Sequence, residues 1–460
     1  MRHPRKNSGC GEVKGVNAEV SAAEDVRPVR VGLCGLGTVG AGTFQLLNDN
    51  ADVISARAGV PIEIAHVGAR SDSLFCDTTG MRVSRDIFAV ANDPDIDVLV
   101  ELIGGTTDAR LLTETALRAG KHVVTANKAL IAEHGNALFA LAVEQGVCLR
   151  FEAAVAGGIP IIKALREGLA GNRIEWLAGI INGTGNFILT EMRDKGREFT
   201  EVLAQAQALG YAEADPSFDI EGIDAAHKLA ILAAIAFGTP LHMESVYTEG
   251  IDRIAPQDVA YAGELGYRIK HLGVARQTES GMELRVHPTL IPERRLLANV
   301  DGVRNAILVM GDAVGPTLYY GAGAGGSPTA SGVVADLIDL ARDIDAGQSN
   351  RIAPLGHSLD ALRELPVVPM QQVETPWYLR MEAEDKPGVL SRIATLLSDQ
   401  GISIEALIQK APLEGQTRVP VVVLTNRAAQ SRVDVAVQAI EALATICGEI
   451  TRIRVETLDG

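Results

Sequence analysis

The residues best suited to do chemistry lie at the start of an apolar helix expected after position 222. Asp224 and Lys228 stand four residues apart, so their side chains share one face of that helix. An unbroken apolar run follows the lysine. A lysine at the edge of a buried helix is a suitable general acid, because desolvation lowers its pKa toward the working pH. An ordinary ion pair that stabilises the helix would give the same pattern, and this segment alone leaves both interpretations open.

Further charged groups accompany this pair. A turn-rich stretch just before the helix carries the carboxylates Glu213, Asp215, Asp219 and Glu221. Together they could hold a cationic group such as the ammonium of a substrate. Lys128 follows a strand expected over 121–126, at the edge of an open α/β sheet where ligands bind. It is a candidate contact for substrate or cofactor, or else a solvated lysine of a loop.

A glycine-rich turn with the spacing GxGxxG is the clearest motif. It comprises Gly35, Leu36, Gly37, Thr38, Val39 and Gly40. The motif follows an apolar strand, Val29–Cys34, and precedes a helix expected over Ala41–Asn48, which is the context of a dinucleotide-binding turn. The glycines allow a tight turn and a close approach to the pyrophosphate, and the helix N-terminus supplies N–H donors. We therefore expect a nicotinamide dinucleotide, NADP or NAD.

The end of the second expected strand, Pro61–Arg70, bears on the choice of dinucleotide. It has no acidic residue at its tip, where an acid would bind the ribose 2′-hydroxyl. Arg70 there favours the 2′-phosphate of NADP, although an ordinary surface arginine is an equal alternative. Asp72 nearby keeps NAD open.

The elements that must position these residues alternate between strands and helices over residues 28–150. The expected strands are Val29–Cys34, Pro61–Arg70, Ile96–Gly104, Lys121–Ala126 and Val147–Ala153. The expected helices are Ala41–Asn48, Asp108–Gly120 and Gly135–Gly146. This alternation predicts an α/β fold, a Rossmann-type doubly wound parallel sheet. Residues 1–27 lack periodicity and are expected to form a disordered tail.

Two further domains are expected after the first. Residues 151–345 mix the helices Ile161–Leu169, Thr200–Leu209, Ile223–Phe237 and Ser331–Ile344 with the strands Trp176–Ile181, Met282–Pro288 and Ala306–Gly311. This is an α+β pattern. A proline-rich linker spans 346–376, and residues 377–460 show the order βαββαβ of a ferredoxin-like module of its own. Its elements are expected at Trp377–Ala383, Val389–Gln400, Ile402–Lys410, Arg418–Thr425, Ala428–Cys447 and Ile450–Glu456.

Composition limits the partners of the chain. The net charge is −16, from 58 acidic and 42 basic residues, and such a surface repels nucleic acid. The longest apolar stretches are far shorter than the roughly 20 residues of a membrane span, and no signal sequence is visible. Five widely spaced cysteines indicate reduced thiols and no disulfide or zinc framework. We expect a soluble, cytoplasmic protein.

Taken together, these motifs resemble homoserine dehydrogenase over about residues 29–455. Besides the glycine turn, the resemblance rests on Gly104-Gly105-Thr106, Ala126-Asn127-Lys128-Ala129-Leu130, the run 151–160, Asn182-Gly183-Thr184-Gly185-Asn186, and the acidic run that ends at Lys228. The resemblance implies an enzyme that reversibly reduces L-aspartate 4-semialdehyde to L-homoserine with NAD(P)H, on the route to threonine, methionine and isoleucine. It also implies that residues 151–345 form the catalytic and dimerisation domain of a homodimer or homotetramer.

The resemblance further implies roles for single residues. Lys228 corresponds to the lysine that protonates the alkoxide, while Glu213, Asp219, Asp224 and Lys128 correspond to substrate-binding positions. Lys128 also lies at the junction with the cofactor. Further implied cofactor contacts are Thr106 and Gly325, and the helix after Gly325 is expected to return to the first domain. A structural sodium ion is implied at Glu152 and the backbone carbonyls of Val155, Gly157 and Ile159, since oxygen-only ligation suits a hard cation.

The C-terminal module resembles an ACT domain, with the run Asp385-Lys386-Pro387-Gly388-Val389-Leu390 at its first strand-to-helix turn. ACT domains bind amino acids, so feedback inhibition by threonine is a hypothesis, and an oligomerisation module without a ligand is the alternative. No aspartate kinase region precedes the glycine turn, so we expect a monofunctional enzyme.

Two other functions compete with this interpretation. One is a dehydrogenase of the same fold acting on another amino-acid aldehyde. The other is a non-catalytic nucleotide-sensing regulator with an ACT effector module. A DNA-binding regulator would need a basic helix-turn-helix, which this acidic chain does not offer.

Overall fold

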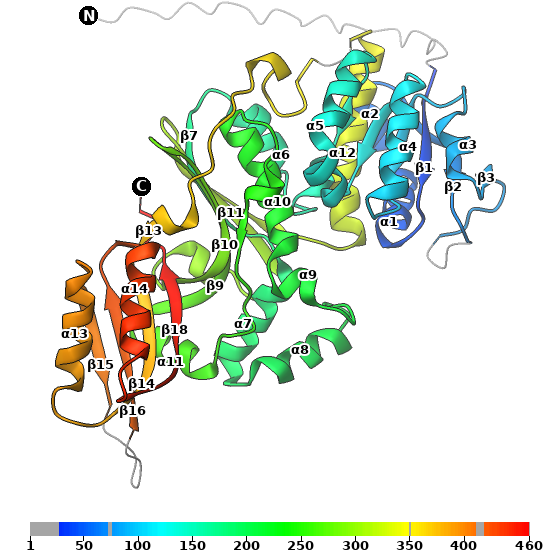
Figure 1. The fold of residues 1–460 in the computed structure, drawn as a ribbon. Coiled ribbons are helices and arrows are strands. Elements are labelled where there is room, and N and C mark those ends of the chain that lie inside the picture. Colours follow the sequence, from blue (N-terminus) through cyan, green and yellow to red (C-terminus); the bar gives the residue numbers. More distant parts are fainter. Residues whose placement is uncertain (1–26, 72–75, 349–350, 411–417, 460) are drawn as a thin grey trace, which may run out of the picture.

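The computed structural model describes residues 27–71, 76–348, 351–410 and 418–459. Three folded parts follow one another in space as they do in sequence (Figure 1). A doubly wound domain at the N-terminus is followed by a mixed central part and a small C-terminal module. The tail expected over 1–27 falls almost entirely outside the described residues.

The first sheet is parallel throughout, with the strand order β3-β2-β1-β4-β5-β6. Its strands are β1 (Val29–Cys34), β2 (Ile62–Gly68), β3 (Val83–Ser84), β4 (Val98–Glu101), β5 (His122–Thr125) and β6 (Leu149–Arg150). Its helices are α1 (Thr38–Asp49), α2 (Ala51–Ala58), α3 (Ile87–Ala91), α4 (Thr107–Arg118) and α5 (Lys128–Glu144). The order reverses between β1 and β4, which makes their carboxyl ends the ligand-binding edge of a doubly wound sheet. The predicted Rossmann-type fold is confirmed.

Two of the predicted boundaries that are wrong in this domain have a local explanation. The helix expected from Gly135 begins at Lys128, because the Asn127 side chain accepts a hydrogen bond from the Leu130 N–H and caps the helix there. The strand expected over 147–153 ends at Arg150, and a 3₁₀ turn follows it. In that turn the Glu152 N–H donates to the Asp336 carboxylate instead of to a neighbouring strand.

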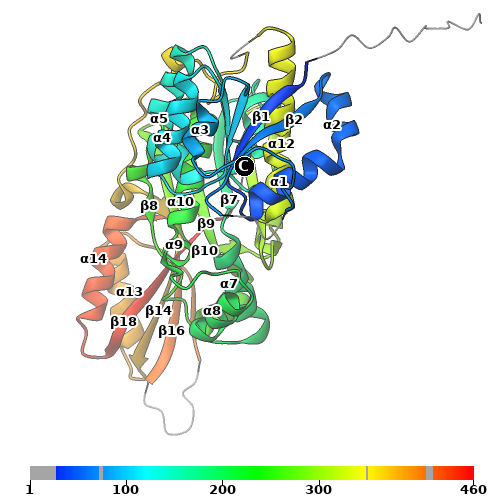
Figure 2. The same ribbon diagram turned by 90° about the vertical axis from the view of Figure 1, so that its right-hand side faces the viewer.

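A long helix from the central part completes the first domain, as expected. Helix α12 (Gly326–Asp345) begins five residues before the predicted Ser331 and packs Val333, Leu337 and Leu340 into the same core as Leu33 of β1. Figure 2 shows α12 alongside α1 and the first sheet. The first domain is therefore closed by residues that lie far along the sequence from it.

The second sheet is mixed and extends through both remaining parts, in the order β12-β11-β7-β9-β10-β18-β14-β16-β15. The strands of the central part are β7 (Ile174–Ile180), β9 (Tyr267–Thr278), β10 (Gly281–Pro292), β11 (Arg304–Gly311) and β12 (Gly315–Ala322), with β8 (Tyr247–Thr248) beside β10. The helices there include α6 (Ile161–Lys163), α7 (Gly183–Lys195), α8 (Phe199–Ala208), α9 (Ser217–Ile220), α10 (Ile223–Phe237) and α11 (Pro256–Glu264). The predicted helix over Ile223–Phe237 agrees at both ends with α10.

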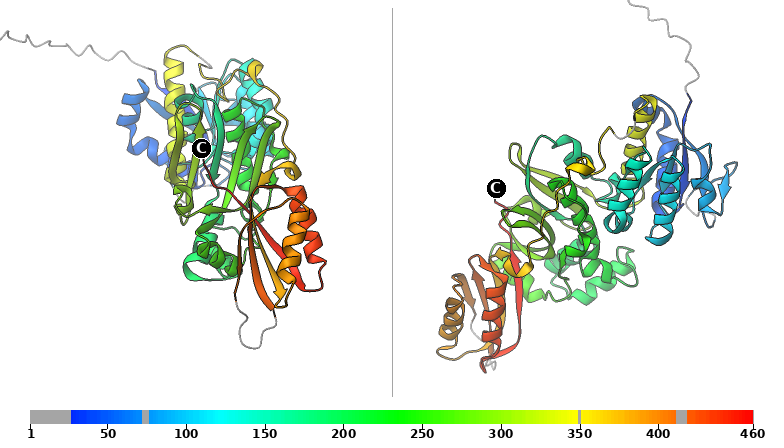
Figure 3. Two further views of the ribbon diagram at one scale, coloured as in Figure 1. Left: turned by 90° about the vertical axis from the view of Figure 1, so that its left-hand side faces the viewer. Right: turned by 45° about the horizontal axis from the view of Figure 1, so that its top comes forward.

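The C-terminal module has the predicted βαββαβ order. Its elements are β14 (Trp377–Glu384), α13 (Val389–Asp399), β15 (Ile404–Gln409), β16 (Arg418–Thr425), α14 (Gln430–Glu441) and β18 (Ile446–Val455). The module is not separate, however, because the end of β18 pairs in parallel with β10 at Thr289↔Arg454 and Leu290↔Val455. Figure 3 shows the C-terminal strands beside the central sheet. The sequence did not predict this continuity.

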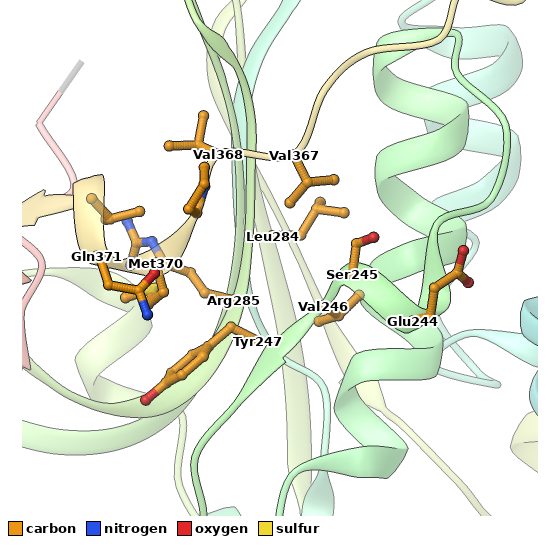
Figure 4. Close-up of a pocket in the computed structure, with 12 residues that line it drawn as sticks. Glu244, Ser245, Val246, Tyr247, Leu284, Arg285, Val367, Val368, Met370 and Gln371 are labelled. Carbon is orange, nitrogen blue, oxygen red and sulfur yellow. The ribbon is translucent and has the colours of Figure 1, made fainter.

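The segment expected as a linker, 346–376, crosses the central part on its way to the module. It forms short 3₁₀ turns at Leu359–Ala361 and Met370–Gln372, and β13 (Glu374–Thr375) pairs with β17 (Ala428–Ala429). Figure 4 shows Val367, Val368, Met370 and Gln371 of this segment around a pocket that they share with Leu284, Arg285 and Tyr247. The domain limits expected from the sequence, 28–150, 151–345, 346–376 and 377–460, stay a prediction.

Candidate active site

A buried carboxylate held between two lysines forms the centre of the candidate site. Asp224 Oδ2 accepts from Lys228 Nζ at 2.7 Å, and Asp224 Oδ1 lies 2.9 Å from Lys128 Nζ. Lys228 Nζ also donates to the Ile181 carbonyl at 2.7 Å. The structure thus brings Lys128 of the first domain to the Asp224–Lys228 pair of α10, although about a hundred residues separate Lys128 from that pair in the sequence.

Burial determines the charges at this centre. The Lys228 side chain is 10% exposed and the Asp224 side chain 5%, whereas the Lys128 side chain is 33% exposed. Burial lowers the pKa of Lys228, and the neighbouring Asp224 partly offsets that decrease. Burial alone would raise the pKa of Asp224, but the two ammonium groups outweigh burial and hold that pKa well below its usual range. A lysine with a lowered pKa beside a fixed carboxylate can give up and regain a proton.

Asn182 positions two carboxylates, a role that the sequence motif did not reveal. Its side-chain amide donates to Asp219 Oδ1 and to Asp224 Oδ2, each at 2.7 Å. Its carbonyl oxygen accepts from the Gly185 N–H and so caps α7. Burial raises the pKa of Asp219, which lies half-buried beside this cluster. A cationic group placed next to Asp219 would offset the effect of burial on its pKa and favour the charged carboxylate.

The dinucleotide turn lines a cleft of about 610 Å³ at the carboxyl ends of β1, β2 and β4. Of the predicted cofactor residues, those lining it are Gly35, Leu36, Gly37, Arg70 and Thr106. The remaining residues of the glycine motif, Thr38, Val39 and Gly40, lie in the first turn of α1. A Cβ atom on Gly40 would lie 1.9 Å from the Gly35 carbonyl oxygen, so only glycine lets α1 pack this closely on the turn. The cleft fits a dinucleotide, because its glycine backbone is open to a close approach.

Asn127 connects this cleft with the lysine pair. Its side-chain amide donates to the carbonyl of Gly105 in the cleft wall at 2.6 Å, and the same side chain caps the helix that begins with Lys128. Below it, the Thr125 hydroxyl donates to the buried Glu101 carboxylate at 2.6 Å. Glu101 also accepts from the backbone N–H groups of residues 103 and 104. These contacts hold the ends of β4 and β5 together and fix the start of α5, and therefore the position of Lys128.

Two predicted residues lie outside the central cluster. The Glu213 side chain is exposed, and its carboxylate has no hydrogen bond or ion pair with Asp224 or Lys228 among the described residues. Gly325 precedes α12 with a φ of 117°, and a Cβ on the following Gly326 would lie 2.9 Å from the Thr38 carbonyl oxygen. The late glycine run therefore packs against the dinucleotide turn, and the role of Gly325 as a cofactor contact stays a prediction.

Comparison with known proteins agrees with this geometry. The family model described as the homoserine dehydrogenase NAD-binding domain matches residues 35–152, the homoserine dehydrogenase model matches 160–338, and the ACT domain model matches 377–445. A homoserine dehydrogenase of Pseudomonas aeruginosa is 60% identical over 434 residues, which cover 94% of this chain and 100% of the relative. The chain belongs to the homoserine dehydrogenase family.

Other homoserine dehydrogenases support the same assignment. The enzyme of Neisseria gonorrhoeae is 53% identical over 94% of this chain and 100% of its own length. A crystal structure of a homoserine dehydrogenase from Thiobacillus denitrificans superposes with a TM-score of 0.89 at 56% identity, covering 94% of this chain and 99% of that one. This family member is thus an NAD(P)-dependent oxidoreductase, and the other aldehyde reductase and the non-catalytic regulator find no support. Among the described residues, no helix has the length and apolarity to cross a membrane.

Proposed function

We propose that this site reduces L-aspartate 4-semialdehyde to L-homoserine, with Lys228 as the general acid. A nicotinamide dinucleotide held in the cleft lined by Gly35, Gly37 and Thr106 would supply the hydride. Lys228 Nζ gives a proton to the aldehyde oxygen and regains it in the reverse direction. The single observation that carries this role is the buried Lys228 ammonium, 2.7 Å from Asp224, whose other carboxylate oxygen pairs with Lys128 at the start of α5.

The remaining polar groups suit the two charged ends of the substrate. We propose that Asp219, Asp224 and Glu213 orient the ammonium group and that Lys128 holds the carboxylate or contacts the cofactor. Asp219 is the best-supported of these, since burial raises its pKa and a substrate ammonium beside it would stabilise its charged form.

The absorbance of NADPH at 340 nm tests the proposed reaction. We expect aspartate semialdehyde to be consumed with loss of that absorbance, and homoserine with NADP⁺ to restore it. Other amino-acid aldehydes, offered at the same concentration, serve as the control for specificity. Cofactor binding without turnover of aspartate semialdehyde would overturn the proposal.

Arg70 makes NADP the proposed cofactor. The side chain is exposed and lines the cleft that Gly35 and Gly37 also line. Asp72, which keeps NAD open as the alternative, lies outside the described residues. A homoserine dehydrogenase of a hyperthermophilic archaeon, 27% identical to this chain, has been solved in complex with NADPH.

Replacing Arg70 with glutamine should raise the KM for NADPH about tenfold, because a hydrogen bond to a charged group contributes roughly 1.5 kcal/mol or more. The KM for NADH, which lacks the 2′-phosphate, should change less than twofold. Steady-state kinetics with both cofactors measure this, with Arg118→Gln, an exposed residue of α4, as a control on the same domain. Equal changes for NADPH and NADH would show that Arg70 does not bind the 2′-phosphate.

We also propose a sodium ion at the turn 152–159. Burial, with the nearby Asp336, raises the pKa of Glu152 to about 7, so a cation beside this carboxylate would favour its charged form. Ala156 has a left-handed φ of 51°, which gives the turn an unusual backbone path. The carboxylate also accepts from the backbone N–H groups of Ile162 and Lys163, and the carbonyls of Val155, Gly157 and Ile159 would complete an oxygen-only set.

For the whole molecule, we propose a homodimer or homotetramer in the cytoplasm, regulated by L-threonine through the ACT module. Strand β12 supports self-association, because it forms an edge of the second sheet and leaves Tyr320 59% exposed. Light scattering after size-exclusion chromatography measures the oligomeric state, and a monomer would contradict the proposal.

A further inference from the structure

A cavity of about 370 Å³ lies between the catalytic part and the ACT module. The module contributes Trp377 of β14, Gln430 of α14, and Arg452 and Arg454 of β18, while the catalytic part contributes the segment 247–253. A second hollow of about 770 Å³ continues from it along α14. Such volumes are typical of small-molecule sites.

Arg454 is the central group of this cavity. It is 2% exposed, and its guanidinium stacks 4.6 Å from the centre of the Trp377 ring and 5.2 Å from that of Tyr247. It donates to the Glu249 carboxylate and to the Gln430 carbonyl oxygen, each at 2.7 Å. Its buried Nε has no hydrogen-bond partner. Because this guanidinium lines the cavity and already holds one carboxylate there, a ligand carboxylate that replaced Glu249 could accept two parallel hydrogen bonds from it.

The rim of the cavity carries charges of both signs. Arg253 adds positive charge, Arg452 is paired with Asp434, and the exposed Asp252 leaves a carboxylate for an ammonium group. A zwitterion fits this arrangement better than a simple anion. We propose that the cavity binds an α-amino acid, with its carboxylate on Arg454, and that binding alters the active site through Glu249 and His271.

Glu249 connects the cavity to the catalytic helix through its backbone. Its carbonyl accepts from His271 Nε2 at 3.0 Å, so the proton of this ring lies on Nε2. Burial lowers the pKa of His271 to about 4, which keeps the ring neutral. A Cβ on Gly222 would lie 3.1 Å from the ring, and Gly222 is the residue directly before α10.

The neighbouring backbone makes a second connection. The Ile251 N–H donates to the Ile220 carbonyl at 3.0 Å, next to Asp219 of the active site. Movement of the segment 247–251 therefore moves the start of α10, which carries Asp224 and Lys228. A ligand carboxylate would compete with the Glu249 carboxylate for the Arg454 guanidinium. The segment 247–251 would then have two discrete states, one with Glu249 bound to Arg454 and one with the ligand bound in its place.

This inference rests on the proposed regulatory function of the ACT module but places the ligand elsewhere than at the Asp385–Leu390 turn. Titration of the intact protein with L-threonine, and then with the other protein amino acids at millimolar concentration, should show one that inhibits and raises the Tm. If none does either, the regulatory function and this site both fail.

Variants of the cavity distinguish the site from the regulatory function. Gln430→Glu places a carboxylate beside Arg454, and Arg454→Lys removes the paired donors, so each should raise the inhibitory concentration at least about tenfold. Glu249→Gln removes the competing carboxylate and should lower that concentration several-fold. Arg418→Gln, exposed on the same module, is the control and should leave inhibition unchanged. If Asp385→Ala abolishes inhibition while Gln430→Glu and Glu249→Gln leave it unchanged, the ligand binds at the turn and the inference is wrong.

His271 tests the transmission separately from binding. His271→Gln keeps an amide donor for the Glu249 carbonyl, whereas His271→Leu removes it. With His271→Leu the amino acid should still raise the Tm but inhibit several-fold less, and His271→Gln should retain most of the inhibition. Full inhibition of a folded His271→Leu protein would overturn the proposed route.

Discussion

Replacing Lys228 with alanine should lower kcat for aldehyde reduction by about 10²–10⁴-fold, the range that a positioned proton donor contributes. The reason is that Lys228 Nζ is the buried ammonium of the site and no second lysine occupies its place on α10. The affinity for NADPH should stay within about threefold, since the general acid contributes to the chemical step and not to cofactor binding. Stopped-flow absorbance at 340 nm and fluorescence titration of NADPH measure the two quantities.

Two controls separate chemistry from folding. Lys195→Ala removes an exposed lysine of α7 that pairs with Glu191, and it should leave kcat unchanged. A thermal melt must show that Lys228→Ala is folded, because the substitution removes the donor to the Ile181 carbonyl and leaves Asp224 Oδ2 with the Asn182 amide but without its ammonium partner. A folded variant with a near-normal rate would refute the role of Lys228.

Asp224→Asn should have the second-largest effect, on both stability and pH dependence. Asparagine keeps the shape but leaves two ammonium groups without their carboxylate, and removing one partner of a buried ion pair costs about 3–5 kcal/mol of unfolding free energy. Denaturant unfolding at neutral pH measures this loss. Asp215→Asn, an exposed carboxylate bonded to Ser217, is the matched control and should change stability by less than about 0.5 kcal/mol.

The pH dependence of Asp224→Asn has a definite sign. The folded pKa of Asp224 lies below its ordinary value of 3.8, so its contribution to stability is present above that pH and is lost as the pH falls through the folded pKa. Asp224 also raises the pKa of Lys228 against burial. Without it, the pKa of Lys228 falls further, and the alkaline decline of the reduction rate should move to lower pH. An unmoved alkaline limb would show that Asp224 does not tune Lys228.

Much of the first domain could be predicted because its signals are local. A strand that ends in a glycine turn, followed by a helix, needs only neighbouring residues, and Gly40 is required by the close approach of α1 to its own turn. Helix α10 was predicted at both ends, since glycine precedes and follows an unbroken apolar run. Strand β9 was not predicted because Arg268, Lys270 and His271 interrupt its apolar pattern, and the carbonyls that Lys270 and His271 bind lie 30 and 22 residues away in the sequence.

The sequence by itself determined the dinucleotide turn, the doubly wound order and the spacing of Asp224 and Lys228 on one helical face. Only the tertiary structure decided that Lys128 joins this pair, that Asn182 holds the carboxylates of Asp219 and Asp224, and that β18 joins the module to the catalytic sheet. The physical reason is the distance along the sequence over which each kind of interaction acts. Turns and helix faces follow from backbone sterics and periodicity within a few residues, whereas charge pairing, desolvation and strand addition depend on which distant segments the whole core brings together.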